Sequence, residues 1–143
     1  MEADMFKKIL IGYDGFEGSL LALEKGLVLA ETLGAEVLVI SVAKVPEYAE
    51  MISEVEEAKE QALKYYGEVL KDVERLSKDK NIKITSMIKY GKPAEIIVNM
   101  AEESGVDLII LGPSKYSYVR RRVLGSTADK VVERAPCSVL IIK

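Results

Sequence analysis

Apolar and polar residues follow two different periods along this chain, and the alternation of the two periods predicts strands and helices in turn. Short apolar runs predict buried strands at residues 6–13, 36–42, 107–112 and 138–142. Residues 82–90 alternate between apolar and polar positions, which predicts a strand with one fully apolar face. Apolar residues recur at helical spacing in the segments between, which predicts helices over residues 20–33, 53–77, 93–103 and 126–135.

Residues at the ends of the predicted helices support these boundaries. Gly34 follows the first helix, as glycine commonly does at a helix C-terminus, and Pro93 suits the first turn of the third helix. The sequence Ser53-x-x-Glu56 has the spacing of a capping box, in which the serine hydroxyl caps the first turn. We therefore expect the second helix to begin at this serine.

Strands that alternate with helices predict a parallel sheet, because each helix returns the chain to the same end of the sheet. The predicted fold class is α/β, a doubly wound five-stranded parallel sheet with helices on both faces, in one domain over residues 1–143. The strand with one apolar face is expected at an edge and the strands apolar on both faces inside, which predicts the order 3-2-1-4-5.

The last strand is expected at the other edge of the sheet. Residues 139–142 are apolar on both faces of this strand, and no inward-pointing charge protects it. An unprotected edge can pair with another chain. We therefore expect a homodimer formed through the strand from Ser138 to Ile142.

The composition limits the classes of function. The chain has 143 residues, of which 49% are hydrophobic and 30% charged, as is typical of a globular domain. Its 20 Lys and Arg against 23 Asp and Glu leave a net charge of -3, so we expect no general binding of nucleic acid or anionic membranes. No apolar run approaches the roughly 20 residues that a membrane-spanning helix needs.

Two residue types limit the catalytic and metal-binding chemistry open to the chain and its expected location in the cell. Histidine is absent, which excludes histidine bases, Ser-His-Asp and Cys-His nucleophile systems, and zinc sites that need imidazole. We expect no catalytic residue and no metal held by protein side chains. Cys137 is the only cysteine and the first residues show no secretion signal, so the expected location is the cytoplasm.

Candidate ligand-binding residues lie where the predicted strand order reverses, since open parallel sheets bind ligands at the carboxyl ends of their strands there. Asp14-Gly15 ends the first strand. The Asp14 carboxylate either accepts hydrogen bonds from a ribose diol or caps the following helix. The sequence leaves both interpretations open.

The loop after the fourth strand offers features suited to an anion. Gly112 ends that strand and permits close approach of a main chain, and Gly125-Ser126-Thr127 opens a helix whose free N–H groups attract an anion. Lys115 and the arginines at 120–122 concentrate positive charge between them. Ser126 and Asp129 also have the spacing of a capping box, which needs no ligand.

Three segments together resemble the universal stress protein family over essentially the whole chain: Asp14-Gly15, residues 112–127 and residues 135–140. The nucleotide-binding branch of that family carries G-x-x-G, then nine residues, then G-[ST]. Gly112, Lys115, Gly125 and Ser126 align with this motif, with Lys115 in place of the second glycine.

The resemblance implies an ATP-binding regulatory module of the stress response that acts as a homodimer, with Mg²⁺ bridging the phosphates. Asp14 would hold the ribose, the backbone around Val42 the adenine, and Gly112 the sugar-phosphate. The expected nucleotide-binding residues are Asp14, Gly15, Val42, Gly112, Lys115, Gly125, Ser126 and Thr127.

Two other functions stay open. Lys115 and Pro113 alter the loop and favour a structural or partner-binding module of the same fold without a nucleotide. Slow ATP hydrolysis has less support, because no histidine and no paired acids are available to activate water. Tyr65 and Tyr66 are predicted to be packing residues rather than a surface on which a base stacks.

Overall fold

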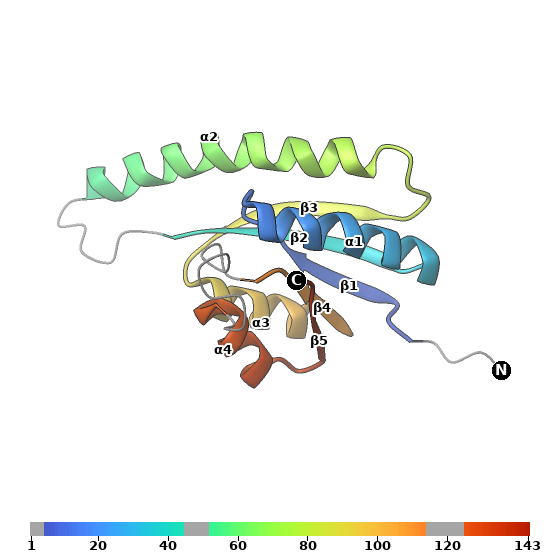
Figure 1. The fold of residues 1–143 in the computed structure, drawn as a ribbon. Coiled ribbons are helices and arrows are strands. Elements are labelled where there is room, and N and C mark those ends of the chain that lie inside the picture. Colours follow the sequence, from blue (N-terminus) through green and yellow to red (C-terminus); the bar gives the residue numbers. More distant parts are fainter. Residues whose placement is uncertain (1–4, 45–51, 114–124) are drawn as a thin grey trace.

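A parallel sheet of five strands forms the centre of the molecule (Figure 1). The computed structural model describes residues 5–44, 52–113 and 125–143. The strands are β1 (Lys8–Gly12), β2 (Glu36–Ala43), β3 (Ile84–Tyr90), β4 (Leu108–Leu111) and β5 (Ser138–Ile141). The helices are α1 (Glu17–Leu33), α2 (Ile52–Ser77), α3 (Pro93–Glu103) and α4 (Ser126–Arg134). The strand order is β3-β2-β1-β4-β5, which confirms the predicted topology.

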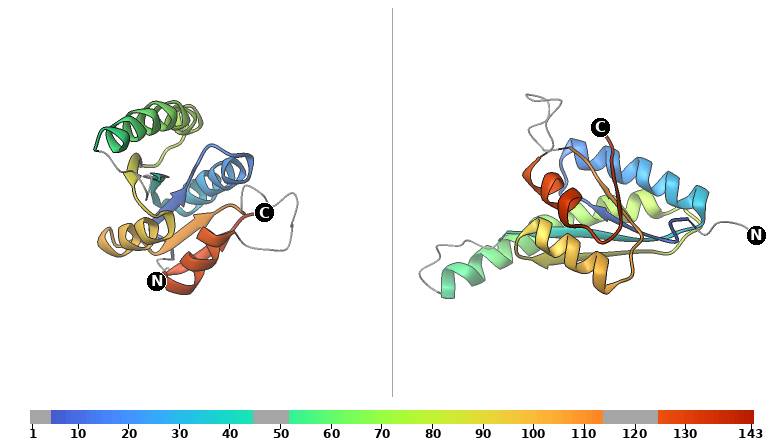
Figure 2. Two further views of the ribbon diagram at one scale, coloured as in Figure 1. Left: turned by 90° about the vertical axis from the view of Figure 1, so that its left-hand side faces the viewer. Right: turned by 90° about the horizontal axis from the view of Figure 1, so that it is seen from below.

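The sheet separates two hydrophobic cores, and the alternation of side chains along each strand assigns residues to one or the other. In β1, Ile9 and Ile11 face one core and Leu10 faces the other. The first core contains α1 and α2 residues, namely Ala22, Leu23, Leu27, Ala30, Val69 and Val73. The second contains α3 and α4 residues, namely Ala94, Ile97, Ala101, Ala128 and Val131. Figure 2 shows the two pairs of helices on opposite faces of the sheet.

Two helix-end predictions are confirmed and two are wrong. Gly34 ends α1 in the left-handed conformation with φ 67°, and Pro93 stands in the first turn of α3. Ser53 does not begin α2, because the helix already includes Ile52. Ser126 does not cap α4 either: Gly125 is the extended residue before the helix, and no side chain in the described part of the chain caps it. A capping serine must itself lie outside the helix, and both serines lie inside.

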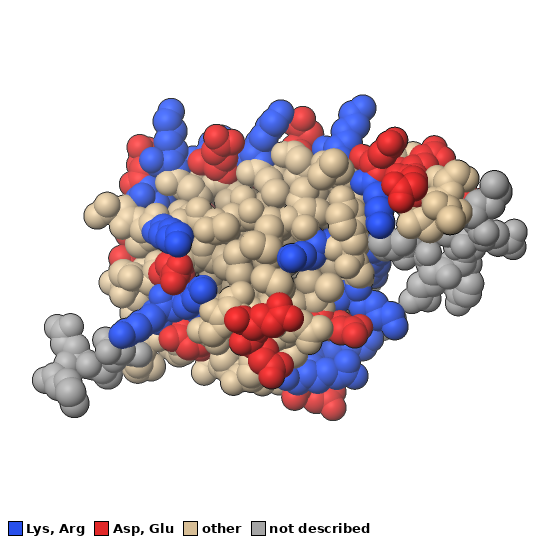
Figure 3. All heavy atoms as spheres, turned by 180° about the vertical axis from the view of Figure 1, so that it is seen from behind, with Lys and Arg blue, Asp and Glu red and all other residues tan. Residues whose placement is uncertain are grey.

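Helix α2 is held to the sheet mainly by its second half. Of its 26 residues only Val69 and Val73 are buried, and Ile52 at its start is 83% exposed. Figure 3 shows charges of both signs along this helix, with acidic side chains gathered toward the end that begins at Ile52. Among the residues that the structure describes, no helix is long and apolar enough to cross a membrane.

Candidate functional site

The chain leaves β1 through a tyrosine that ties this strand to both β2 and α2. Tyr13 is buried, and its hydroxyl donates a hydrogen bond of 2.8 Å to Oδ2 of Asp72 on α2. Burial, followed by the hydrogen bond to the Asp72 carboxylate, raises the pKa of Tyr13. The hydroxyl of fully buried Ser41 on β2 donates to the Tyr13 carbonyl at 2.6 Å. These contacts hold Tyr13 in place, and Asp14, the first candidate site residue, follows it directly.

Asp14 closes the turn between β1 and α1. Its Oδ1 accepts hydrogen bonds from the Phe16 N–H at 2.9 Å and from the Ser19 hydroxyl at 2.5 Å. Phe16 is the residue that precedes α1, and no side chain hydrogen-bonds as its cap. Asp14 is therefore a turn aspartate, as one of the two interpretations held, although its carboxylate bonds the residue before α1 and Phe16 occupies the cap position. Hydrogen bonding to a residue two positions ahead is typical of an aspartate in a turn.

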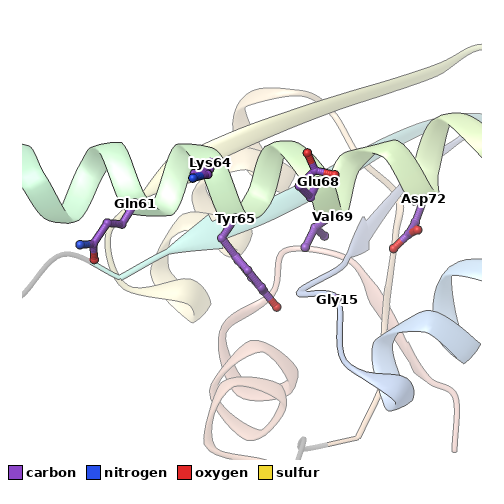
Figure 4. Close-up of a pocket in the computed structure, with 7 residues that line it drawn as sticks. All are labelled: Gly15, Gln61, Lys64, Tyr65, Glu68, Val69 and Asp72. Atoms are coloured by element: carbon purple, nitrogen blue, oxygen red, sulfur yellow. The ribbon is translucent and has the colours of Figure 1, made fainter.

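Gly15 brings this turn against α2. Its φ of +88° favours glycine, and a Cβ there would stand 2.9 Å from Val69 and 3.0 Å from the Tyr65 hydroxyl. Figure 4 shows Tyr65 and Val69 pointing from α2 toward the turn. An open pocket of about 530 Å³ lies here, lined by Gly15, Gln61, Lys64, Tyr65, Glu68, Val69 and Asp72. Of the predicted site residues that the structure describes, Gly15 alone lines this pocket.

Gly112 meets the start of α1, so the two predicted turns do lie together. A Cβ on Gly112 would stand 2.4 Å from the Gly18 carbonyl oxygen and 2.9 Å from the Ser19 nitrogen. The Pro113 ring also packs against Gly18. The close main-chain approach expected at Gly112 is thus made by the protein itself, which gives this glycine a structural role.

The start of α4 supplies main-chain donors at the same end of the sheet as the start of α1 (Figure 2). The first helical hydrogen bond recorded there runs from the Asp129 N–H to the Gly125 carbonyl at 2.9 Å. The N–H groups of Ser126, Thr127 and Ala128 therefore have no acceptor within the helix, and no side chain of residues 5–44, 52–113 or 125–143 caps them. Such a helix start attracts an anion.

The remaining predicted residues stand as follows. Val42 lies near the end of β2 with its side chain half-buried toward the second core. The Tyr13 N–H bonds to the Ile40 carbonyl at 3.0 Å, which holds the end of β2 beside the Asp14 turn. Lys115 lies outside the described residues. The structure thus gathers Asp14, Gly15, Gly112 and the start of α4 at one end of the sheet, with Val42 on the next strand.

The sequence interpretation missed the part played by Tyr65. Tyr66 packs against the first core as expected, and the two rings meet edge to face at 4.8 Å. Tyr65 is 46% exposed, and its hydroxyl donates to the Asp14 carbonyl at 3.1 Å. Helical geometry held a clue, because neighbouring helix residues project about 100° apart, so that Tyr65 and Tyr66 point in different directions.

Ser19 was also missed. Its side chain is 9% exposed in the first turn of α1, where it bonds to both the main chain and the carboxylate of Asp14. The available signal was a serine in the first turn of a predicted helix, five positions after the candidate aspartate. Hydroxyl residues in such places commonly bond to nearby backbone and side-chain groups.

A doubly wound sheet with a carboxylate and a helix start at its switch point defines a class of α/β proteins that bind ligands at the carboxyl ends of their strands. A model of the universal stress protein family matches residues 5–143, and this chain belongs to that family. Universal stress protein MJ0531 of Methanocaldococcus jannaschii is 34% identical over 142 residues, which cover 98% of this chain and 84% of that protein.

Solved structures of the family share the fold. Universal stress protein UspA from Lactobacillus plantarum has a TM-score of 0.82 at 22% identity, covering 99% of this chain and all of that one. A universal stress protein solved in complex with cAMP has a TM-score of 0.73 at 21% identity, covering 96% and 97% of the two chains. A family member from Arabidopsis thaliana with AMP bound has a TM-score of 0.70 at 20% identity, covering 96% and 91%.

Proposed function

We propose that this universal stress protein binds ATP at the carboxyl end of its sheet and acts in the cytoplasm as a homodimeric regulatory module of the stress response. The observation that carries the proposal is the meeting of the Asp14 turn with the end of β4, at the end of the sheet where α4 also begins. The family members with cAMP or AMP bound support an adenine nucleotide as the ligand class.

The residues of this site fit the parts of such a nucleotide. Asp14 has a carboxylate oxygen free of hydrogen bonds from the described residues and would take a ribose hydroxyl. The N–H groups of Ser126 and Thr127 at the start of α4, which have no acceptor among the described residues, would take phosphate oxygens. The backbone around Val42 would contact adenine. Mg²⁺ would neutralise negative charge on the phosphates. Gly15 and Gly112 would shape the turns, and Lys115 would add a positive charge.

A pair of variants at one position tests the phosphate part of the site. Ser126 is the first residue of α4, a position that tolerates proline, and the preceding Gly125 has φ -66° and ψ 160°, which proline also accepts. Ser126→Pro therefore deletes the hydroxyl and one main-chain donor without breaking the helix. The matched control Ser126→Ala deletes the hydroxyl and keeps the donor.

Isothermal titration calorimetry with ATP and Mg²⁺ measures the effect. We expect Ser126→Pro to weaken ATP affinity about 10- to 100-fold relative to Ser126→Ala, the worth of a hydrogen bond to a charged group. Equal affinities would contradict the role of the main-chain donor. Absence of binding by the native protein at millimolar ATP, AMP and cAMP would refute the proposed function.

The homodimer is proposed through β5, the last strand of the described sheet. Leu140 on that strand is 37% exposed, although it lies among residues that pack into the cores. Leu140→Lys should convert a dimer to a monomer in sedimentation velocity at micromolar concentration. Leu33→Lys on α1 is the matched control, because Leu33 is 41% exposed and far from β5 in the sequence. A monomeric native protein would overturn this part of the proposal.

A second function is a structural or partner-binding module without a nucleotide. The favouring observation is the Pro113 ring, which packs against Gly18 and removes one main-chain donor from the loop after β4. Under this alternative, Lys115→Gly, which restores the family glycine, gains ATP affinity over the native protein. An unchanged or lower affinity would count against it.

A further inference from the structure

Hydrogen bonds within the chain occupy almost all polar atoms of Asp14. Its N–H donates to the Ser19 hydroxyl oxygen at 3.2 Å, and its carbonyl accepts from the Tyr65 hydroxyl at 3.1 Å. Its Oδ1 accepts from the Phe16 N–H at 2.9 Å and from the Ser19 hydroxyl at 2.5 Å. Oδ2 is left as the one polar atom of Asp14 without a recorded hydrogen bond in the described part of the chain.

Oδ2 is at least partly accessible to solvent. The described residues contain no buried side-chain oxygen or nitrogen that lacks a hydrogen-bond partner, so an oxygen of Asp14 without a partner must be accessible. A carboxylate oxygen only accepts hydrogen bonds, and it repels phosphate. The ligand group that suits it is therefore a neutral donor such as a sugar hydroxyl.

Ser19 is placed to set the orientation of this carboxylate. The Ser19 hydroxyl bonds to both the N–H and Oδ1 of Asp14. These two bonds restrict rotation of the Asp14 side chain about its first torsion. Its single hydroxyl proton goes to Oδ1 at 2.5 Å rather than to the Phe16 carbonyl at 3.1 Å, because the bond to a carboxylate is the stronger one.

Tyr65 holds the main chain of the same residue from the other side. Its hydroxyl reaches across from α2 to the Asp14 carbonyl, 51 positions away in the sequence. Figure 4 shows its ring directed from the helix toward the turn at Gly15. The carbonyl and the carboxylate are thus anchored by different helices, α2 and α1.

We propose that Ser19 and Tyr65 are positioning residues that present Oδ2 of Asp14 to a ribose hydroxyl and so determine the preference for nucleotides with an intact ribose. This inference rests on the proposed nucleotide site and goes beyond it by assigning sugar selectivity to two residues that need not touch the ligand.

The test compares ATP with dideoxy-ATP, an analogue that lacks both ribose hydroxyls, by calorimetry with Mg²⁺. The native protein should prefer ATP about tenfold or more, the worth of one hydrogen bond to a carboxylate. Ser19→Ala should lower this preference at least about threefold. Thr32→Ala is the matched control, because Thr32 lies on the same helix and its hydroxyl donates to the Val28 carbonyl, away from Asp14; the preference should stay native.

The ratio of the ATP affinity to the dideoxy-ATP affinity distinguishes a positioning role from a general loss of structure. A general loss of structure would weaken the binding of both ligands equally. Tyr65→Phe provides a second variant that deletes only a hydroxyl from a half-exposed side chain, and it should lower the preference in the same direction. A native preference in both Ser19→Ala and Tyr65→Phe would overturn the inference while nucleotide binding stands. Equal binding of both ligands by the native protein would also overturn it. Binding of neither would remove the proposed function itself.

Discussion

Adding a single methyl group at Gly112 should destabilise the protein in the absence of any ligand. A Cβ there would stand 2.4 Å from the Gly18 carbonyl oxygen, 2.7 Å from its carbon and 2.9 Å from the Ser19 nitrogen. Ordinary van der Waals contact begins near 3.4 Å, so β4 and the start of α1 must separate by about 1 Å. All three neighbours are main-chain atoms, which cannot rotate away as a side chain does.

The expected cost of Gly112→Ala is about 3 kcal/mol, the upper end of the usual range for an overpacked site. For a chain of this size it lowers the melting temperature by about 6–12 °C. Urea unfolding followed by circular dichroism, without nucleotide, measures this cost. Gly67→Ala is the control: nothing lies within 4 Å of the added methyl, and alanine favours the helix, so stability should rise by up to about 1 kcal/mol.

The steric argument fails if Gly112→Ala unfolds within about 0.5 kcal/mol of the native protein, the size of an ordinary surface substitution. A variant of native stability that had lost only nucleotide affinity would indicate that the glycine is needed for the ligand. A variant of lower stability would show that the glycine is needed for the fold before any ligand binds.

Three further outcomes are expected. Because the pKa of Tyr13 is raised in the fold, its contribution to stability is complete below about pH 10 and is lost as the pH rises further. The urea midpoint of the native protein should therefore fall above this pH, and that of Tyr13→Phe should fall less. A native midpoint that does not change with pH would contradict this. Both Gly15 and Gly34 have positive φ, but the Cβ space is open only at Gly34, so Gly15→Ala should unfold at a lower urea concentration than Gly34→Ala; the reverse order would refute the contact with α2. Val131→Ala should cost about 2–3 kcal/mol and Val132→Ala less than about 0.5, because Val131 is fully buried and Val132 is 49% exposed; equal losses in thermal unfolding would show that α4 is rotated.

The fold could be predicted from the sequence because the apolar pattern of a strand indicates whether one or both of its faces are buried. Leu10 and Ile11 are both apolar, and this strand has a core on each face. The alternation at residues 82–90 marked an edge, and β3 is at the edge. These patterns are local, so burial alone distinguished the β3 edge from the interior strands, whereas the place of β5 at the other edge did not follow from its own apolar pattern.

The site was less predictable, since its geometry depends on contacts between distant residues. The Tyr65 hydroxyl and the Asp14 carbonyl are 51 positions apart, and no local pattern indicates that they bond. Ser126 showed a different limit: the spacing of a capping box was present, but the extended conformation fell on Gly125, which places the serine one residue too far into the helix. A motif gives the residue types and leaves the backbone angles undetermined.

The uneven attachment of α2 has a consequence for how the protein opens. The helix is about 39 Å long, and both of its buried residues, Val69 and Val73, lie in its second half. Amide protons in the first half can exchange with solvent when the helix end unwinds, without disturbing either hydrophobic layer. Amides near Val73 exchange only when the whole layer above the sheet comes apart. One continuous helix therefore contains two levels of protection, and the boundary between them lies near the tyrosine that reaches the Asp14 turn.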